Sequence, residues 1–290
     1  PDNAYFGEKD FQQLILIKSL AEKLNLNLNV VGCKTIREKD GLAMSSRNKL
    51  LSKKERESAG EIIKLLLKAK EMNSDFDYRQ IKLMVSDMDS TLISIETIDE
   101  VAREVGLSQE ISLITEKAMQ GHLDFSESFK KRLSILKGVR TESFNAVYEN
   151  KLKLNSGASE LVNFFKSTNV KTALVSGGIN YFAEKVKDQL GIDTYRANDV
   201  EINNETLTGK VFGNIVDAKA KAKYIEELCV LYELKPNQVI AIGDGANDLE
   251  MMKLAGLSVA FHGKPILKKN CDIQINYGGL NSLIDFFDQS

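Results

Sequence analysis

Three carboxylates follow short apolar runs of the sequence and are the first candidates for chemistry. Asp87 comes directly after LMVS, Asp89 follows two residues later, and Asp244 comes directly after VIAIG. In an open α/β sheet, ligands bind beyond the carboxyl ends of the strands, so we expect these side chains to share one site. Carboxylates held together repel one another, and a divalent cation relieves that repulsion. Because all these ligands are oxygen atoms, the sequence predicts Mg²⁺ as the cofactor.

A third apolar run, TALV, ends at the segment Ser176–Gly178. Backbone N–H groups at the start of the following helix can cradle phosphate oxygens. Together with a metal and a lysine from the helix expected at 217–233, they favour phosphoryl transfer from a phosphate monoester. A carboxylate can be the nucleophile by forming an aspartyl-phosphate. Either Asp87 or Asp89 would then attack, and the other would be the general acid and base.

Each motif also has a simpler explanation. The DxDxT pattern at 87–91 is compatible with a turn and a helix cap, and GDGAND at 243–248 with a tight glycine turn. Two such patterns, each at the end of an apolar run, favour a catalytic site over two unrelated turns. The sequence holds two histidines, which excludes a multi-histidine metal site and argues against a serine–histidine–aspartate triad.

The elements that must position these groups alternate between short strands and helices. We expect strands at 81–86, 170–175, 238–242 and 257–260, helices at 157–167, 179–190, 217–233 and 247–255, and a hairpin at 195–213. Such alternation is typical of a parallel sheet covered on both faces. Four more helices are expected near 96–106, 109–120, 125–137 and 141–153. The expected fold class is therefore α/β, a Rossmann-like parallel sheet with a helical cap inserted at 93–155.

The first part of the chain has its own pattern. Apolar positions recur at helical spacing over 11–24, and apolar residues alternate with asparagines over 26–30, as in a half-buried strand. Ser52 and Glu55 predict a capping box at the start of a helix that runs to about Glu71.

Length and composition predict a folded protein of unequal parts. The 290 residues exceed one domain of average size, and 43% hydrophobic with 28% charged residues is ordinary for a globular chain. We expect a partial α/β segment at 1–71, a polar linker at 72–80, and a core domain at 81–290 that includes the cap.

Charge and cysteine content restrict the partners. The 39 Lys and Arg residues against 41 Asp and Glu residues give a formal net charge of −2, so neither nucleic acid nor a membrane surface is expected as a partner. The three cysteines form no CxxC pair, which fits a reducing compartment. Neither a membrane-spanning run nor a signal peptide is recognisable. We expect a cytoplasmic protein with a small-molecule substrate, and the oligomeric state is not predicted.

Residues 82–290 resemble the haloacid dehalogenase superfamily and, more narrowly, the phosphoserine phosphatases. The motifs that carry this resemblance are DMDST (87–91), ETIDE (96–100), EKAMQGHLDFSESFKKR (116–132), VSGG (175–178), VDAKAKA (216–222) and GDGANDL (243–249). The resemblance implies hydrolysis of O-phosphoserine to serine and phosphate through an aspartyl-phosphate, the last step of serine biosynthesis. The alternative is a phosphatase or phosphotransferase for another small phosphomonoester, such as phosphohomoserine.

The same resemblance implies roles for the carboxylates. Asp87 would be the nucleophile and Asp89 the general acid and base. Mg²⁺ would be held by Asp87, Asp244 and the backbone carbonyl of Asp89, with Asp248 supporting the metal site.

For the phosphoryl group, the resemblance implies binding by Ser176, Gly177 and Lys221, with Asn247 nearby. The family pattern VDAxxKA selects Lys221 over the two neighbouring lysines of its helix.

The cap would select the substrate. A phosphorylated amino acid carries an ammonium and a carboxylate, and the resemblance assigns these to Glu96 and Arg132, with Met119 and Phe125 as the apolar wall. The alternative for these four is structural: an exposed carboxylate at a helix start, one base among several, and two residues of the cap core.

Residues 1–75 resemble a different family, the pantothenate synthetases (pantoate–beta-alanine ligases), through FGEKDFQQL (6–14) and REKDGLAMSSRN (37–48). The resemblance places Lys9 and Asp10 near ATP and Gln13 near pantoate. It places four residues near the nucleotide phosphates: Met44, Ser45, Ser46 and Arg47. This chain contains no HxGH motif, which that family requires, so we do not expect ligase activity. A ligase fragment or fusion is the alternative function.

Overall fold

The computed structural model describes residues 2–288 with gaps at 40, 54, 57–79 and 120–121. The chain divides into two compact units, Pro1–Asp77 and Tyr78–Ser290. Among the described residues, no helix has the length and apolar character needed to cross a bilayer.

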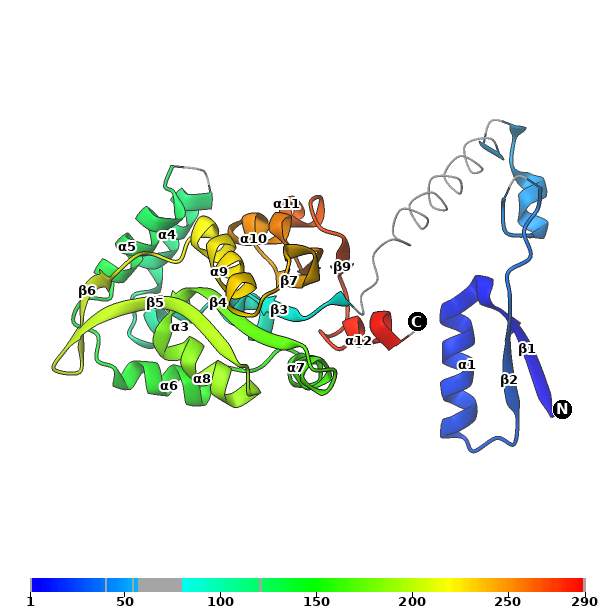
Figure 1. Ribbon diagram of the computed structural model, residues 1–290, viewed down its shortest axis with the longest axis horizontal. Coiled ribbons are helices and arrows are strands. Elements are labelled where there is room, and N and C mark those ends of the chain that lie inside the picture. The colour runs from blue at the N-terminus through cyan, green and yellow to red at the C-terminus, as the bar shows by residue number, and fades with distance from the viewer. Residues whose placement is uncertain (1, 40, 54, 57–79, 120–121, 289–290) are drawn as a thin grey trace. The chain divides into compact units, whose positions relative to one another are not determined.

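The second unit is built on a seven-stranded sheet in the order β6-β5-β4-β3-β7-β8-β9 (Figure 1). Neighbouring strands are parallel, except for the antiparallel pair β5 and β6. The strands are β3 Leu83–Ser86, β4 Lys171–Ile179, β5 Thr194–Asn203, β6 Thr206–Phe212, β7 Val239–Gly243, β8 Leu257–Phe261 and β9 Ile273–Ile275.

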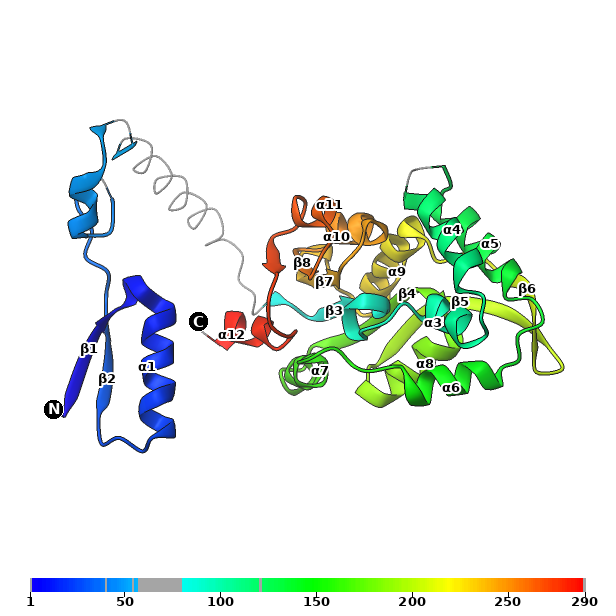
Figure 2. The ribbon, with the colours of Figure 1, turned by 180° about the vertical axis from the view of Figure 1, so that it is seen from behind.

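Helices cover both faces of this sheet (Figures 1 and 2). One face packs against α9 and α10, where Leu83 and Val85 of β3 join a buried cluster with Ile225 and Met251. The central strands β3, β7 and β8 are buried at every position, as expected where helices lie on both sides. The helices of the core are α7 Ala158–Ser167, α8 Asn180–Leu190, α9 Ala218–Leu231, α10 Leu249–Leu254, α11 Pro265–Lys268 and α12 Ser282–Asp288. The predicted α/β class with a parallel sheet is confirmed.

A helical cap is inserted between β3 and α7. Its helices are α3 Thr97–Glu104, α4 Ser108–Met119, α5 Phe125–Ile135 and α6 Glu142–Asn150. The two linkers of the cap lie side by side: Ile93 forms a β-bridge with Leu154, and the Asn155 side chain donates to the carbonyls of Thr91 (2.8 Å) and Ile93 (3.1 Å). The inserted helical cap is therefore as expected, and both its ends leave the core at one point.

The hairpin β5–β6 reaches from the sheet edge to the cap. Val139 and Leu207 are joined through the backbone, since Leu207 N donates to the Val139 carbonyl (2.9 Å), and Arg140 forms a β-bridge with Thr206. The hairpin thus supports the cap at the connection between α5 and α6.

The first unit contains two parallel strands, β1 Asn3–Gly7 and β2 Asn29–Cys33, and the helix α1 Phe11–Lys23. The strand expected at 26–30 begins later than predicted. Leu26 instead completes the end of α1: its N–H donates to the Ala21 carbonyl (2.9 Å) beyond Asn25, which has a left-handed φ of 49°.

The capping box predicted at Ser52 is confirmed. Ser52 N donates to Glu55 Oε2 (2.8 Å), and Glu55 N donates to Ser52 Oγ (3.3 Å). Most of the helix expected to 71 and of the linker expected at 72–80 lies outside the described residues.

Candidate active site

The chain turns sharply where β3 ends, and this turn presents both carboxylates of the DxDxT motif. Asp87 has extended backbone angles, and Ser90 has a left-handed φ of 57°. The Asp89 carboxylate is held by Thr97, whose backbone N–H donates to Oδ1 (3.0 Å) and whose hydroxyl donates to Oδ2 (3.4 Å). The first residues of the cap therefore fix one of the two candidate catalytic groups.

Lys221 lies at the centre of the site. Its Nζ is 2.7 Å from Asp87 Oδ1 and 2.8 Å from Asp248 Oδ1, and its side chain is fully buried. Asp217 caps α9 by accepting from Ala220 N (2.9 Å), and one turn later the helix carries Lys221 into the core. The neighbouring lysines of this helix, Lys219 and Lys223, are exposed.

Both carboxylate oxygens of Asp248 accept hydrogen bonds. Besides Lys221, it accepts from the backbone N–H of Asp244 (3.1 Å) and of Gly245 (3.0 Å) through Oδ2. Asp248 therefore holds the loop that follows β7 in place, which suits the supporting role expected for it.

Three buried carboxylates could hold a metal ion. One oxygen from each of Asp87, Asp244 and Asp248 lies within 4.8 Å of the others. Since both Asp248 oxygens accept from other groups, the oxygens most open to a cation belong to Asp87 and Asp244. Among the described residues, the cation paired with Asp244 is Lys264, whose Nζ is 3.9 Å from Oδ2. An oxygen-only donor set with excess negative charge fits a hard divalent cation.

Burial and mutual repulsion control the protonation of this cluster. Burial raises the pKa of Asp89 to about 7, with help from Glu96, and burial and Asp248 raise the pKa of Asp244 to about 6. Burial, aided by Asp248, also raises the pKa of Asp87 against the effect of Lys221. Burial lowers the pKa of Lys221, but its two carboxylate partners outweigh this and leave it raised. The lysine is therefore charged, and the carboxylates outnumber it.

The segment expected as a phosphate loop, Ser176–Gly178, lies beside these groups. It belongs to the end of β4, because this strand runs to Ile179 and not to 175 as predicted. The Ser176 hydroxyl is 3.5 Å from Asp89 Oδ2, and Ser176 Oγ accepts from the Gly178 N–H (2.8 Å). A Cβ on Gly178 would lie 2.6 Å from Asp89 Oδ2, so only a glycine leaves room for the carboxylate. Ser176 and Gly178 thus lie against Asp89, which is two residues from Asp87, the partner of Lys221.

The predicted cap residues are placed as follows. Phe125 begins α5 and contacts Gly177 of the loop. Glu96 is exposed and accepts from the Ser90 hydroxyl (2.9 Å), and Arg132 pairs with Asp99 (3.7 Å). The two remaining residues are less informative: Met119 ends α4 but its side chain lies outside the described residues, and Asn247 is partly buried in the loop after β7.

Two residues of the site were not predicted from the sequence. Thr97 binds Asp89 through its backbone and its hydroxyl. Asn198, fully buried in β5, donates to the Gly177 carbonyl (2.8 Å) and accepts from Val216 N (2.7 Å). Thr97 could have been found from the sequence, because it is a threonine at the start of a predicted helix. Asn198 could not, because nothing distinguishes one asparagine within a predicted hairpin.

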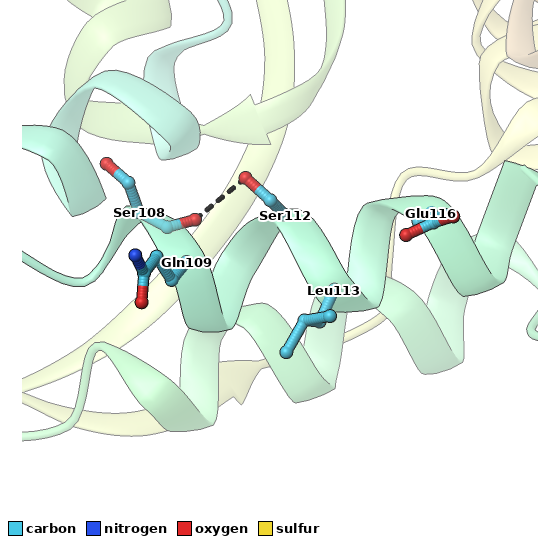
Figure 3. Close-up of a pocket in the computed structure, with 5 residues that line it drawn as sticks. All are labelled: Ser108, Gln109, Ser112, Leu113 and Glu116. Atoms are coloured by element: carbon cyan, nitrogen blue, oxygen red, sulfur yellow. Dashed lines mark hydrogen bonds between the residues drawn. The ribbon is translucent and has the colours of Figure 1, made fainter.

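A separate hollow lies along the cap helix α4 (Figure 3). It has a volume of about 400 Å³ and is lined by Ser108, Gln109, Ser112, Leu113 and Glu116. None of these residues belongs to the carboxylate cluster or to the phosphate loop.

In the first unit, the two ligase-like motifs meet at one hydrogen bond, from Lys9 Nζ to the Met44 carbonyl (3.2 Å). Ser45 Oγ accepts from Arg47 N (3.3 Å). The other residues expected to contact ligase substrates are Asp10, Gln13 and Ser46, and these are exposed.

Two family models match the chain. The model of the haloacid dehalogenase-like hydrolases matches residues 81–256, and that of the pantoate-beta-alanine ligases matches residues 1–143. The second match extends beyond the segment 1–75 that resembles this family. The overlap at 81–143 falls in the second unit, where these residues form β3 and the helices α3, α4 and α5.

Relatives and solved structures match about 71% of the chain. The chain is 44% identical over 211 residues to a phosphoserine phosphatase of Albidiferax ferrireducens, covering 71% of this chain and 89% of the relative. It is 38% identical to one from Methanocaldococcus jannaschii, covering 71% and 97%. A substrate-bound phosphoserine phosphatase structure superposes with a TM-score of 0.67 at 37% identity, covering 71% and 98%. The chain therefore belongs to the haloacid dehalogenase-like hydrolases, within the phosphatase family whose members are named phosphoserine phosphatase.

Proposed function

We propose that the chain is a Mg²⁺-dependent phosphatase that hydrolyses O-phosphoserine to serine and phosphate through an aspartyl-phosphate on Asp87. One observation carries the proposal: the buried Lys221 ammonium bridges Asp87 and Asp248 within a cluster that has excess negative charge. A phosphate monoester brings negative charge of its own, so this cluster needs both the lysine and a divalent cation to accept it. Release of serine would place the reaction at the last step of serine biosynthesis.

The residues divide the reaction into two steps. In the first, an Asp87 oxygen attacks phosphorus, the bond from phosphorus to the serine oxygen breaks, and the carboxyl of Asp89 gives its proton to that oxygen. In the second, Asp89 takes a proton from water, whose oxygen attacks phosphorus and releases phosphate from Asp87. The raised pKa of Asp89, about 7, supports its first role, because an acid must hold its proton near neutral pH.

The charge on the transferred group has several partners. Asp87 and Asp244 would hold Mg²⁺, as would the backbone carbonyl of Asp89, and the ion would neutralise part of the phosphate charge. Lys221 would bind a phosphate oxygen from the side of Asp87. The Ser176 hydroxyl and the backbone of Gly177 would bind the remaining oxygens, with Asn247 nearby.

The substrate proposal depends on the cap. Glu96, exposed at the start of α3, suits the ammonium of an amino acid. Arg132 suits its carboxylate, because a guanidinium can bind both carboxylate oxygens. Phe125 over Gly177 would close the site around the phosphate, with Met119 proposed as the other apolar contact.

A phosphate-release screen tests the proposal. The chain is incubated with a panel of phosphomonoesters, with Mg²⁺ or with a chelator, beside Asp87→Asn as a control. We expect a preference for O-phosphoserine that needs Mg²⁺ and disappears in Asp87→Asn. Full activity in that variant would exclude Asp87 as nucleophile. A new phosphorylated product in the presence of homoserine would identify phosphotransfer instead.

The ligase alternative has its own test. The hydrogen bond from Lys9 to the Met44 carbonyl brings two motifs of that family together in the first unit. Equilibrium binding of ATP and pantoate to the full chain distinguishes the two functions. Micromolar binding of both ligands would support a ligase role beside the phosphatase.

A further inference from the structure

The end of β4 departs from regular strand pairing, and this leaves backbone groups that need partners. Val175 pairs with Arg196 of β5, but the next pair along is Ile179 with Asn198. Between them β4 has three residues where β5 has one, so Ser176–Gly178 bulges out of the ladder. Bulges of this kind re-aim backbone groups beside functional sites, and a buried carbonyl left outside the ladder must find another donor.

The side chain of Asn198 supplies that donor. It is fully buried, and its Nδ2 donates to the Gly177 carbonyl (2.8 Å), which lies within the bulged segment. Its Oδ1 accepts from Val216 N (2.7 Å), in the segment that leads into α9. The amide has one orientation here, because turning it over would place donor against donor and acceptor against acceptor.

We propose that Asn198 is a positioning residue of the phosphate site, which orients the Ser176 hydroxyl through the Gly177–Gly178 peptide. This inference rests on the proposed function. The carbonyl of Gly177 and the N–H of Gly178 belong to one planar peptide and point in opposite directions. When Asn198 holds the carbonyl, the N–H is directed at Ser176 Oγ, to which it donates at 2.8 Å.

The consequence for Ser176 concerns its proton. Because its oxygen already accepts from Gly178, the hydroxyl hydrogen turns away from the peptide, toward Asp89 Oδ2 at 3.5 Å. That side is where the transferred phosphate would lie. Asn198 thereby keeps Ser176 as a donor to the site.

Asn198 also connects two parts of the site that are distant in sequence. Val216 is buried and stands directly before Asp217, the residue that caps α9. One amide thus fixes the distance between the phosphate loop and the helix that carries Lys221.

The substitution Asn198→Asp tests this role with almost no change of shape. The carboxylate still accepts from Val216 N but cannot donate to the Gly177 carbonyl. The matched control is Thr172→Val, at the other end of β4, which removes the buried hydrogen bonds between the Thr172 hydroxyl and Asp193 of the loop before β5. Both variants are compared with the unmodified chain for melting temperature, kcat and KM on O-phosphoserine, and inhibition by inorganic phosphate.

We expect Asn198→Asp to lower kcat/KM by roughly 10- to 100-fold and to weaken phosphate inhibition, as a small misplacement of a binding group does. Thr172→Val should lower the melting temperature with kcat/KM unchanged. The activity of Asn198→Asp relative to the unmodified chain should rise as pH falls, because the protonated carboxyl regains a donor.

Two results would overturn the inference in different ways. If Asn198→Asp changes only the melting temperature, as Thr172→Val does, Asn198 has a structural role alone. If the unmodified chain releases phosphate from none of the monoesters, the proposed function fails and the inference fails with it.

Discussion

The ring of Phe125 lies against the backbone of Gly177, so closely that a Cβ added to the glycine would overlap ring carbon Cζ. Phe125 begins helix α5 of the cap, and Gly177 belongs to the phosphate loop at the end of β4. Cap and core therefore meet directly over the proposed phosphate site, and their contact depends on the missing side chain of one glycine.

Gly177→Ala tests this contact. The new methyl group would push the Phe125 ring away, so we expect kcat/KM for O-phosphoserine to fall by roughly 10-fold or more. The second change Phe125→Leu removes the ring and should restore part of the loss. Measuring both single variants and the double variant gives their coupling. If the two effects simply add, the contact does not control the reaction.

Lys221→Met should be damaging to both activity and stability. It leaves Asp87 and Asp248 buried without their cation, and breaking such a pair costs about 3–5 kcal/mol. We expect a matching drop in the free energy of unfolding in urea, and no measurable phosphate release. The control Lys219→Met changes an exposed lysine of the same helix and should behave like the unmodified chain. Equal stability of the two variants would contradict the central position of Lys221.

Asp244→Asn should remove the response to Mg²⁺, whereas Asp248→Asn should lower stability itself. The Asp244 side chain forms a long ion pair with Lys264 (3.9 Å), so Asp244→Asn should keep the fold but lose the rise in melting temperature on adding Mg²⁺. Asp248 accepts from Lys221 and from two backbone N–H groups, so Asp248→Asn should lower the melting temperature even with a chelator. A Mg²⁺ response retained by Asp244→Asn would place the ion elsewhere.

The carboxylates also predict how stability depends on pH without a metal. In the folded chain the pKa is about 7 for Asp89 and about 6 for Asp244, against an ordinary value of 3.8 for each. Between the ordinary and the raised pKa values, the folded chain binds more protons than the unfolded chain. The free energy of unfolding should therefore fall as pH rises from about 4 to about 7. Urea titrations in a chelator measure this slope, and Asp89→Asn should make it shallower. A stability that rises over this interval would contradict the burial of these groups.

Arg132→Ala separates substrate selection from chemistry. Loss of a charged hydrogen-bonding partner should raise KM for O-phosphoserine by roughly 10- to 100-fold. The rate on p-nitrophenyl phosphate, which has no carboxylate, should change little. Lys131→Ala, at the exposed neighbouring position, is the matched control. Equal losses on both substrates would assign Arg132 to the cap structure, through its pairing with Asp99.

The apolar runs made much of the core predictable. LMVS and VIAIG are short, apolar nearly throughout and followed by Asp, and they form the buried strands β3 and β7. The residues that follow them therefore located the carboxylate cluster from the sequence alone. The cap helices were also recognisable, because each has an apolar face at helical spacing.

The long-range contacts around the candidate catalytic groups could not be predicted from the sequence. Asn198 acts on Gly177 and Val216, which lie 21 and 18 residues away, so no local pattern marks it. The pairing of Arg132 with Asp99 likewise joins two helices of the cap. Such contacts depend on how elements pack, and that packing has no signal at any single position.

The two linkers of the cap, joined at Ile93 and Leu154 and held by Asn155, have a consequence for how such enzymes diversify. Because the insertion leaves and re-enters the core at adjacent residues, another cap could occupy the same junction while Asp87 and Lys221 stay in place. Such a cap would have to supply the two hydrogen bonds that Thr97 donates to Asp89. The cap residues proposed to select the substrate could therefore change without replacing the core residues proposed to transfer the phosphoryl group.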